Sequence, residues 1–241
     1  DGKHFISGSW DDTLCLWNIE SGECKRVYNG HCFGVIAVKC IDEKYFISCG
    51  NDNIFYLWNI ISGMHERRYQ GDMSRVLAMN ICLNGLYFIS GNDGNFLRLW
   101  NIKSRICEKV YKGHKNCIRT IAMCVDRKHF ISGGDDKTCR LWNIESGKCE
   151  RVYKGHKNWI YAIAVCFNGV HFISGSHDTT IRLWNIGSSK CKKIWKGLYP
   201  IYTIAMCYGG LYFISGSYRG DNKTIQLWEL PDYICGNIKK K

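Results

Sequence analysis

The sequence has very little proline, no long apolar run and no segment typical of a linker or a helix. Its two prolines, Pro200 and Pro231, stand at the boundaries of predicted strands, where a missing backbone N–H costs least. No stretch is long and apolar enough for a transmembrane helix, and no secretory signal peptide is recognisable. With 46% hydrophobic residues the chain can bury a sizeable core. We therefore expect one folded domain built from strands.

Motifs of common enzyme and metal sites are also absent. The chain has 15 cysteines but no C-x-x-C, and no histidine pair stands at zinc-ligand spacing from cysteine. Neither the phosphate-cradling G-x-x-x-x-G-K nor H-E-x-x-H occurs. An odd, regularly placed set of cysteines argues against a disulfide framework. We expect a reducing intracellular compartment, the cytoplasm with the nucleus as an alternative, and neither a metal ion nor a cofactor.

Internal repetition is what the chain has in abundance. The stretch HFISGSHDTTIRLWNI, residues 171 to 186, recurs in recognisable form six times at a spacing of 41 to 44 residues. The copies contain the tryptophans Trp17, Trp58, Trp100, Trp142, Trp184 and Trp228. Such a period indicates stacked copies of one supersecondary unit. Each copy predicts two strands joined by a tight turn, and flanking segments such as Cys149 to Tyr153 and Ile160 to Cys166 supply two more.

This four-strand unit, with a G-H before it and L-W-N-I within it, resembles the WD40 repeat. The resemblance covers the whole chain, although the family's Asp after Trp is Asn in five copies and Glu229 in the sixth. It implies an all-β fold, a β-propeller of four-stranded antiparallel blades. The repeat units are expected at about residues 1–29, 30–70, 71–112, 113–154, 155–196 and 197–241 of a single domain.

The first unit lacks its innermost strand, so six units predict 23 strands. The last unit is expected to be complete, because Cys235 and Ile238 stand where its fourth strand should begin. Since a propeller closes its ring to hide its edges, at least one strand is expected upstream of residue 1, in a parent with six or seven blades.

Charge and cysteine both follow the repeat. The chain has 33 Lys and Arg against 21 Asp and Glu, a net charge of +12. The basic residues recur at the predicted outermost strands: Lys25, Arg26, Arg67, Arg68, Lys109, Lys112, Arg151, Lys154, Lys192 and Lys193. Lysine on an unpaired edge blocks aggregation, and the alternative is a surface for nucleic acid or another polyanion. Cysteines seven residues after the tryptophan, such as Cys24 and Cys149, are expected to be small buried hydrophobes.

Three sets of residues look catalytic and are interpreted as structural. His156, Ser174 and Asp178 have the composition of a Ser-His-Asp triad, but the resemblance implies a hydrogen-bonded tetrad with Trp184 inside the blade. The same tetrad recurs as His31, Ser48, Asp52 and Trp58, and as His114, Ser132, Asp136 and Trp142. An enzyme needs one activated nucleophile in a cleft, not three copies in blade interiors. We therefore expect no catalytic residue and no enzymatic activity.

Two units depart from the tetrad. In the third, Asp72 replaces the histidine and Gly94 replaces the aspartate. In the sixth, Leu198 lies near the histidine position and Asn222 stands at the aspartate position. These blades are expected to be less rigid than the blades with a complete tetrad.

Recognition residues should break the repeat, whereas structural residues follow it. Trp10 precedes the turn aspartate, at the position held elsewhere by Asn51, Asp93, Asp135, His177 and Asp221. Trp159 lies three residues past His156, and Tyr161 corresponds to Ile36, Leu77, Arg119 and Tyr202.

We expect a partner-binding surface on the face of the G-H loops. Its aromatic part comprises Trp10, Trp159, Tyr161, His177 and Tyr202, and its opposite arc comprises Arg75, Asp93, Arg119 and Asp135. The predicted function is a non-catalytic scaffold or adaptor that binds a peptide or protein and forms part of a larger chain or complex. We expect neither association with a membrane nor a small-molecule substrate. The alternatives are a basic propeller that binds nucleic acid or another polyanion, and isolated exposed aromatics without a role.

Overall fold

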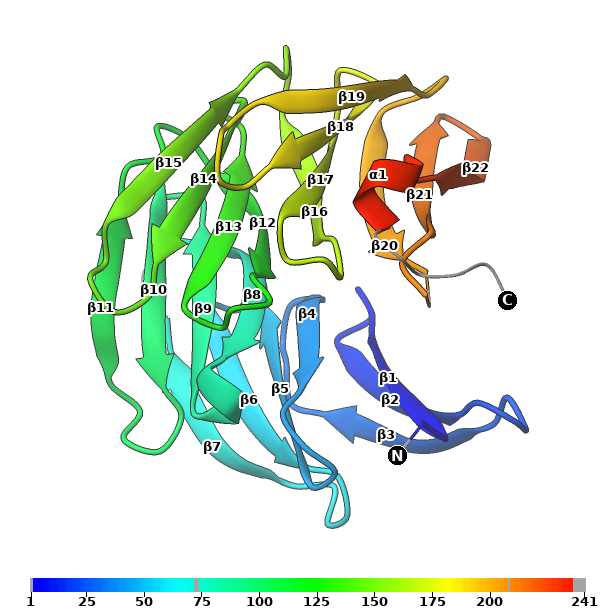
Figure 1. Cartoon of the computed structure of the whole chain (residues 1–241). Helices are drawn as coiled ribbons and strands as arrows, with labels where there is room; N and C mark the ends of the chain where they lie inside the picture. The colour runs from blue at the N-terminus through cyan, green and yellow to red at the C-terminus, as the bar shows by residue number, and fades with distance from the viewer. Residues whose placement is uncertain (1, 72–73, 208, 236–241) are drawn as a thin grey trace. The chain divides into compact units, whose positions relative to one another are not determined.

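The computed structural model describes residues 2–71, 74–207 and 209–235 and consists of antiparallel sheets (Figure 1). Six sheets follow one another along the chain, and we call them blades 1 to 6. The chain divides into two compact units, residues 1–110 and 111–241. Each unit is described by itself, and the single-domain organisation stays a prediction.

The first unit contains blades 1 to 3, and in each blade the spatial order of the strands is their order in the chain. Blade 1 consists of β1 (His4–Gly8), β2 (Thr13–Asn18) and β3 (Cys24–Asn29). Blade 2 consists of β4 (Val35–Cys40), β5 (Tyr45–Gly50), β6 (Ile54–Asn59) and β7 (His65–Gln70). Blade 3 consists of β8 (Val76–Cys82), β9 (Tyr87–Asn92), β10 (Phe96–Asn101) and β11 (Cys107–Lys112), with the 3-10 turn η1 (Leu83–Gly85) after β8. The last two residues of β11 fall in the second unit.

The second unit contains blades 4 to 6. Blade 4 consists of β12 (Ile118–Met123), β13 (His129–Gly134), β14 (Thr138–Asn143) and β15 (Cys149–Lys154). Blade 5 consists of β16 (Ile160–Val165), β17 (His171–Ser176), β18 (Thr180–Asn185) and β19 (Cys191–Lys196). Blade 6 consists of β20 (Ile201–Met206), β21 (Tyr212–Arg219) and β22 (Asn222–Glu229), followed by the short helix α1 (Asp232–Cys235).

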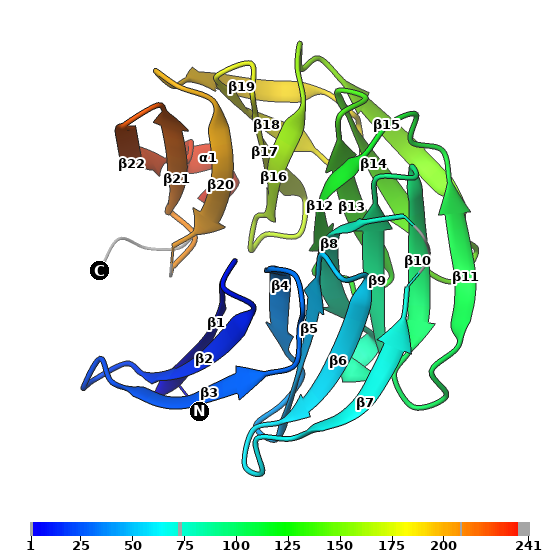
Figure 2. The ribbon, with the colours of Figure 1, turned by 180° about the vertical axis from the view of Figure 1, so that it is seen from behind.

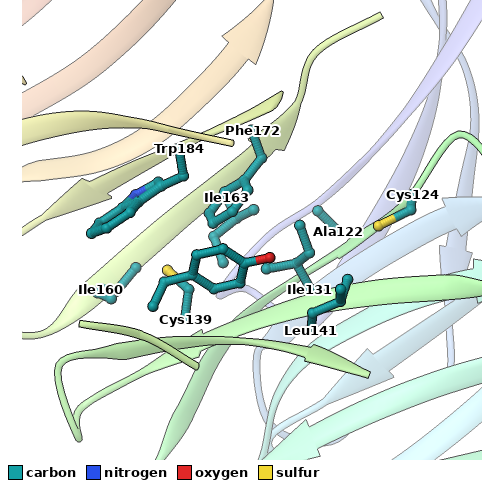
Figure 3. Close-up of a cluster of buried hydrophobic side chains, with 10 residues drawn as sticks. Ala122, Cys124, Ile131, Cys139, Leu141, Ile160, Ile163, Phe172 and Trp184 are labelled. Carbon is teal, nitrogen blue, oxygen red and sulfur yellow. The ribbon is translucent and has the colours of Figure 1, made fainter. Parts of the chain in front are cut away.

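The core of the second unit lies between the faces of neighbouring blades. The first strands of its blades are adjacent, β12 beside β16 and β16 beside β20 (Figure 2). Figure 3 shows the cluster between blades 4 and 5, where Phe172 and Trp184 lie near Ile131, Cys139 and Leu141. All five side chains are almost completely buried. Because truncation of such a buried aromatic costs about 3–5 kcal/mol, this contact stabilises the stack of blades.

A β-bulge lies at the start of the first strand in every complete blade and in blade 6. The register of pairing shifts by one residue there, for example between Ile160 and Ala162 in β16. The extra residues are Ile36, Leu77, Arg119, Tyr161 and Tyr202. A bulge re-aims the side chain that it inserts. These five positions lie where the chain leaves each G-H loop, or its counterpart in blades 3 and 6, which is the face of the predicted surface.

The all-β architecture and the missing innermost strand of blade 1 are confirmed. Of the fourth strand predicted from Cys235 in blade 6, only Cys235 itself lies within the described residues, which contain 22 strands, and it is the last residue of α1. After Pro231 the chain turns into α1, and Leu230 and Ile234 pack into the cluster between blades 5 and 6. The side chain of Asn168 donates to the carbonyl of Ile234 at 2.9 Å. Ile238 lies outside the described residues.

A second correction concerns the hairpin of blade 6, whose strands are eight residues long instead of six. Ile201 pairs with Ser217 as Ile160 pairs with Ser176. Tyr218, not Asp221, therefore occupies the position of His177. Asp221 lies in the two-residue turn at the hairpin tip, and Asn222 pairs with Arg219 in the ladder and does not occupy the tetrad position.

The sequence predicted that the cysteines seven residues after each tryptophan are buried hydrophobes, and this prediction is wrong. Cys24 is exposed and Cys107, Cys149 and Cys191 are half-buried. Their thiols donate to the carbonyl two residues further on, at 3.4 to 3.6 Å. This position follows the register shift between the third and fourth strands, for example between Leu141 and Trp142 in blade 4, so a small thiol satisfies the irregular backbone. No helix in the part of the chain that the structure describes has the length and apolar character of a membrane span.

Candidate interaction site

The tetrad of blade 5 forms one chain of hydrogen bonds. The indole Nε1 of Trp184 donates to Ser174 Oγ at 2.8 Å, and the Ser174 hydroxyl donates to Nε2 of His156 at 2.7 Å. Nδ1 of His156 donates to Asp178 Oδ2 at 2.9 Å. The same contacts join His31, Ser48, Asp52 and Trp58 in blade 2 and His114, Ser132, Asp136 and Trp142 in blade 4.

The protonation of this chain follows from burial. Burial lowers the pKa of His156, so its imidazole is neutral, with one ring nitrogen donating and the other accepting. Burial alone would raise the pKa of Asp178, but the hydrogen bonds from His156, Thr180 and Lys157 outweigh it and hold that pKa well below its usual range. Ser174 is completely buried and its oxygen is already engaged. The tetrad therefore rigidifies the blade and has no serine oxygen open to a substrate.

The other blades keep only part of the tetrad. Blades 1, 3 and 6 retain the bond from tryptophan to serine, at 2.8 to 2.9 Å. In blade 3, Asp72 lies outside the described residues, and Asn92 accepts from the backbone N–H of Phe96 where an aspartate would act. In blade 1, Asp11 accepts hydrogen bonds from the backbone N–H and the hydroxyl of Thr13.

Six of the predicted recognition residues, together with Tyr218, make one network of contacts in the second unit, which we call the aromatic cluster. Its members are Arg119, Asp135, Trp159, Tyr161, His177, Tyr202 and Tyr218. The ring of His177 lies 5.9 Å from that of Trp159 and 6.2 Å from that of Tyr161. Tyr161 then contacts Tyr202 at 4.8 Å, and Tyr202 stacks on Tyr218 at 4.4 Å.

The charged end of the cluster is internally compensated. Arg119 donates to both carboxylate oxygens of Asp135, from Nε at 2.9 Å and from Nη2 at 2.7 Å. Its guanidinium lies 5.7 Å from the ring centres of both Trp159 and Tyr161, a cation–π geometry. The sequence placed Arg119 and Asp135 on an arc opposite the aromatic residues. The structure instead places Arg119 against the rings of Trp159 and Tyr161, with Asp135 bound to its guanidinium.

The remaining predicted residues lie in the first unit. Trp10 is 75% exposed, and its ring lies so close to Gly34 that a side chain there would overlap it. Trp10 and Arg75 line one shallow hollow, and the backbone N–H of Asp93 donates to the carbonyl of Arg75 at 3.0 Å. One surface that joins this group to the aromatic cluster stays a prediction.

Sequence reasoning missed Tyr218. Its signal was the uninterrupted match of FISGSYR, residues 213 to 219, to FISGSHD, residues 172 to 178. The position of Tyr218 is not recognised when Asp221 is aligned with the residue before the turn aspartate of the other blades, because the extra residues of blade 6 lie at the tip of the hairpin.

Two of the basic residues on the outermost strands have a structural role. Arg26 Nη1 donates to the carbonyl of Ser62 in blade 2 at 3.1 Å. Arg67 Nη1 donates to the carbonyls of Ile102 and Lys103 in blade 3 at 2.8 and 2.6 Å. These arginines tie a blade to its neighbour. Among the described residues no group of three or more His, Cys, Asp or Glu side chains is placed to hold a metal ion.

A comparison with protein families decides the affiliation of the chain. The profile of the WD domain, G-beta repeat (WD40) matches residues 1–18, 22–59, 105–143 and 147–185, more than half of the sequence. The chain belongs to the WD40 family. No curated protein matches the chain significantly.

Each of the four WD40 matches ends one residue after the tryptophan of a third-strand position, at Asn18, Asn59, Asn143 and Asn185. The third strands of blades 3 and 6 lie outside the matched segments, and these blades have incomplete tetrads. The six sheets are thus blades of a WD40 propeller, a fold that generally serves as a protein-interaction scaffold and is typically non-catalytic.

Proposed function

We propose that this chain is a non-catalytic scaffold that binds a peptide or protein partner through the aromatic cluster of its second unit. The observation that carries the proposal is a continuous set of ring contacts that remains accessible on the G-H loop face. Trp159 is 40% exposed and Tyr218 is 49% exposed, while Tyr161, His177 and Tyr202 lie half-buried between them.

Partly packed aromatic rings suit recognition. Each ring offers a large area at a low entropic cost, because it has few rotatable bonds, and Trp, Tyr and Arg dominate binding hot spots. Ring contacts and the Arg119–Asp135 pair hold the cluster in place before a partner arrives, which reduces the entropy lost on binding. Burial and the neighbouring Tyr218 hydroxyl raise the pKa of Tyr202 to about 12, so its hydroxyl stays neutral.

The partner chemistry follows from the charge of the cluster. Asp135 neutralises Arg119 with both oxygens, and the other members of the cluster are aromatic side chains without a carboxylate, an ammonium or a guanidinium group. The cluster therefore favours apolar or aromatic side chains of a partner over a strongly charged segment.

The experiment is selection of binding peptides from a random display library on the intact chain, followed by affinity measurement with Trp159→Ala. Loss of Trp159 should weaken the selected peptides by about 2 kcal/mol or more, the size of a hot spot. The unfolding free energy should change by no more than about 0.5 kcal/mol, as for an exposed site.

The matched control is Phe167→Ala, an exposed aromatic of the same unit in the loop between β16 and β17 at the other end of the strands. This variant should leave peptide affinity unchanged. Equal losses in both variants, or unfolding of the Trp159 variant, would contradict the proposal. An intracellular site of action stays a prediction from the sequence.

A further inference from the structure

A basic hollow of about 440 Å³ lies in blade 4 beside the start of blade 5. Its lining includes Lys115, Lys137, Arg140 and Lys154, together with Asp136 and His156. The volume falls within the roughly 300–1,000 Å³ that is ordinary for ligand pockets. The hollow shares no residue with the aromatic cluster.

The topology of the blade explains why these cations meet. Lys115 follows the G-H loop before β12, and Lys137 lies in the turn between β13 and β14. Arg140 is near the start of β14, and Lys154 ends β15, the strand paired with it. All four positions therefore lie at the same end of an antiparallel sheet, on the face of the G-H loops.

Arg140 lacks good acceptors. Its side chain is only 13% exposed, and its Nε has no hydrogen-bond partner. The contacts of its two Nη atoms are long, 3.8 Å to Asp136 Oδ2 and 3.9 Å to Cys149 Sγ, beyond the range of a strong hydrogen bond. Arg140 therefore keeps most of its positive charge uncompensated beside the hollow, and this charge would attract an anion.

The single carboxylate that lines the hollow does not cancel this charge. Asp136 accepts hydrogen bonds from His114, from the backbone N–H of Lys115, and from Thr138. Its charge is thus largely used within the tetrad. Burial lowers the pKa of His156, which stays neutral. Four cations therefore face one engaged carboxylate.

We propose that this hollow binds a phosphate monoester carried by a phosphorylated peptide. Planar guanidinium and ammonium donors suit the several acceptor oxygens of a dianionic phosphate. A concave site for one anionic group favours a phosphorylated side chain over a nucleic-acid backbone, which needs a row of contacts. Only the peptide part rests on the proposed function. Asp135 of the aromatic cluster and Asp136 of the hollow are consecutive residues, so one peptide can reach both sites.

The test uses inorganic phosphate as the first probe, titrated to about 20 mM into the intact chain at constant ionic strength and followed by NMR. Saturable shifts are expected for the backbone amides of Lys115, Lys137 and Gly155. The triple variant K115Q/K137Q/K154Q should raise the dissociation constant by about tenfold or more. Its three lysines are exposed, so the fold should remain. Arg140→Gln should weaken phosphate in the same direction.

The matched control is K148Q/K190Q/K192Q, which removes the same charge from exposed positions of the same unit and should leave phosphate affinity within about twofold. No saturable shift, or equal weakening in both triple variants, would overturn the proposal.

Two further arms separate the sources of phosphate. A peptide selected through the aromatic cluster is compared with and without a phosphoserine, and the phosphate should strengthen binding in the wild type but not in K115Q/K137Q/K154Q. A short single-stranded oligonucleotide that binds more tightly than the phosphopeptide, and depends equally on both lysine triplets, would refute the peptide assignment. Trp159→Ala should weaken the peptide but not inorganic phosphate, so failure of the aromatic site is distinguishable from failure of the hollow.

Discussion

Replacing Asp178 with alanine removes a carboxylate that accepts four hydrogen bonds. The donors are Nδ1 of His156 at 2.9 Å, the backbone N–H of Lys157 at 2.7 Å, and the N–H and hydroxyl of Thr180 at 2.9 and 2.6 Å. The side chain of His156 is inaccessible to water, so without Asp178 its Nδ1–H keeps only the longer contact to the Thr180 hydroxyl at 3.2 Å. Leaving a buried donor unsatisfied costs about 1–3 kcal/mol, and we expect a loss of unfolding free energy of that size.

The chain contains its own control. Asp11 accepts from the N–H of Thr13 at 3.1 Å and from its hydroxyl at 2.7 Å, in the corresponding turn of blade 1, and it has no hydrogen bond to a histidine among the described residues. Alanine at Asp11 therefore removes the turn bonds alone, at an exposed site, and should have a much smaller effect. The comparison isolates the buried part of the tetrad.

The assay is thermal and denaturant unfolding followed by circular dichroism. A loss of about 2 kcal/mol corresponds to a fall in Tm of roughly 4–8 °C for a chain of this size. In a His156→Leu background the effect of Asp178→Ala should shrink, because the buried donor is already gone, and a double-mutant cycle measures that coupling. Equal falls in Tm at Asp11 and Asp178, or a coupling of zero, would refute the tetrad argument.

Three further outcomes are expected. The folded-state pKa values of His156 and Asp178 both lie below their ordinary values of 6.5 and 3.8, so the unfolded state binds more protons than the folded state at low pH. Denaturation curves recorded at several pH values should therefore show that stability falls as the pH drops below about 6.5 and again below about 4. Nucleic-acid binding, measured by fluorescence anisotropy, should be weak and should be lost near physiological salt concentration. Tight binding would instead support a true polyanion surface, if a plot of log binding constant against log salt concentration has a slope much steeper than the value of about −0.9 for a single phosphate contact. Arg119→Tyr should lower Tm by leaving the buried Asp135 unpaired, while Arg119→Tyr with Asp135→His, which copies blade 5, should restore it; no recovery in the double variant would contradict the pairing.

The repeat was predictable from sequence because the fold depends on residues that recur at a fixed spacing. Trp58, Trp142 and Trp184 are almost completely buried in third strands, so their regular spacing reports the period of the stack. The histidine of each G-H pair reaches the serine of the second strand in the same way in three blades. Such positions carry the same physical demand in each copy, and repetition alone reveals them.

The ends of the structure were not predictable in this way. Cys235 matches the spacing of a fourth strand but is the last residue of α1, whose Ile234 packs together with Leu230 into the cluster between blades 5 and 6. The spacing of the repeat also failed to identify Tyr218, because an insertion at a hairpin tip shifts the turn residues along the sequence but leaves the register of the strand unchanged. A local pattern cannot weigh an apolar contact with a distant strand against a ladder of backbone hydrogen bonds.

The positions of the side chains in the aromatic cluster follow from a backbone rule that the sequence does not display. In blades 4 to 6 the first strand begins at a residue that pairs with Gly134, Ser176 or Ser217 of the second strand. The bulge residue contacts the residue that follows this partner, as Arg119–Asp135, Tyr161–His177 and Tyr202–Tyr218. The bulge fixes where these side chains project but not which residues they are. An ion pair, an aromatic–histidine pair and a tyrosine stack therefore occupy equivalent positions in the three blades. Because each pair satisfies itself, its chemistry can change without disturbing the strands that support it. The face of the second unit therefore joins a repeated framework to a set of contacts that differs in every blade.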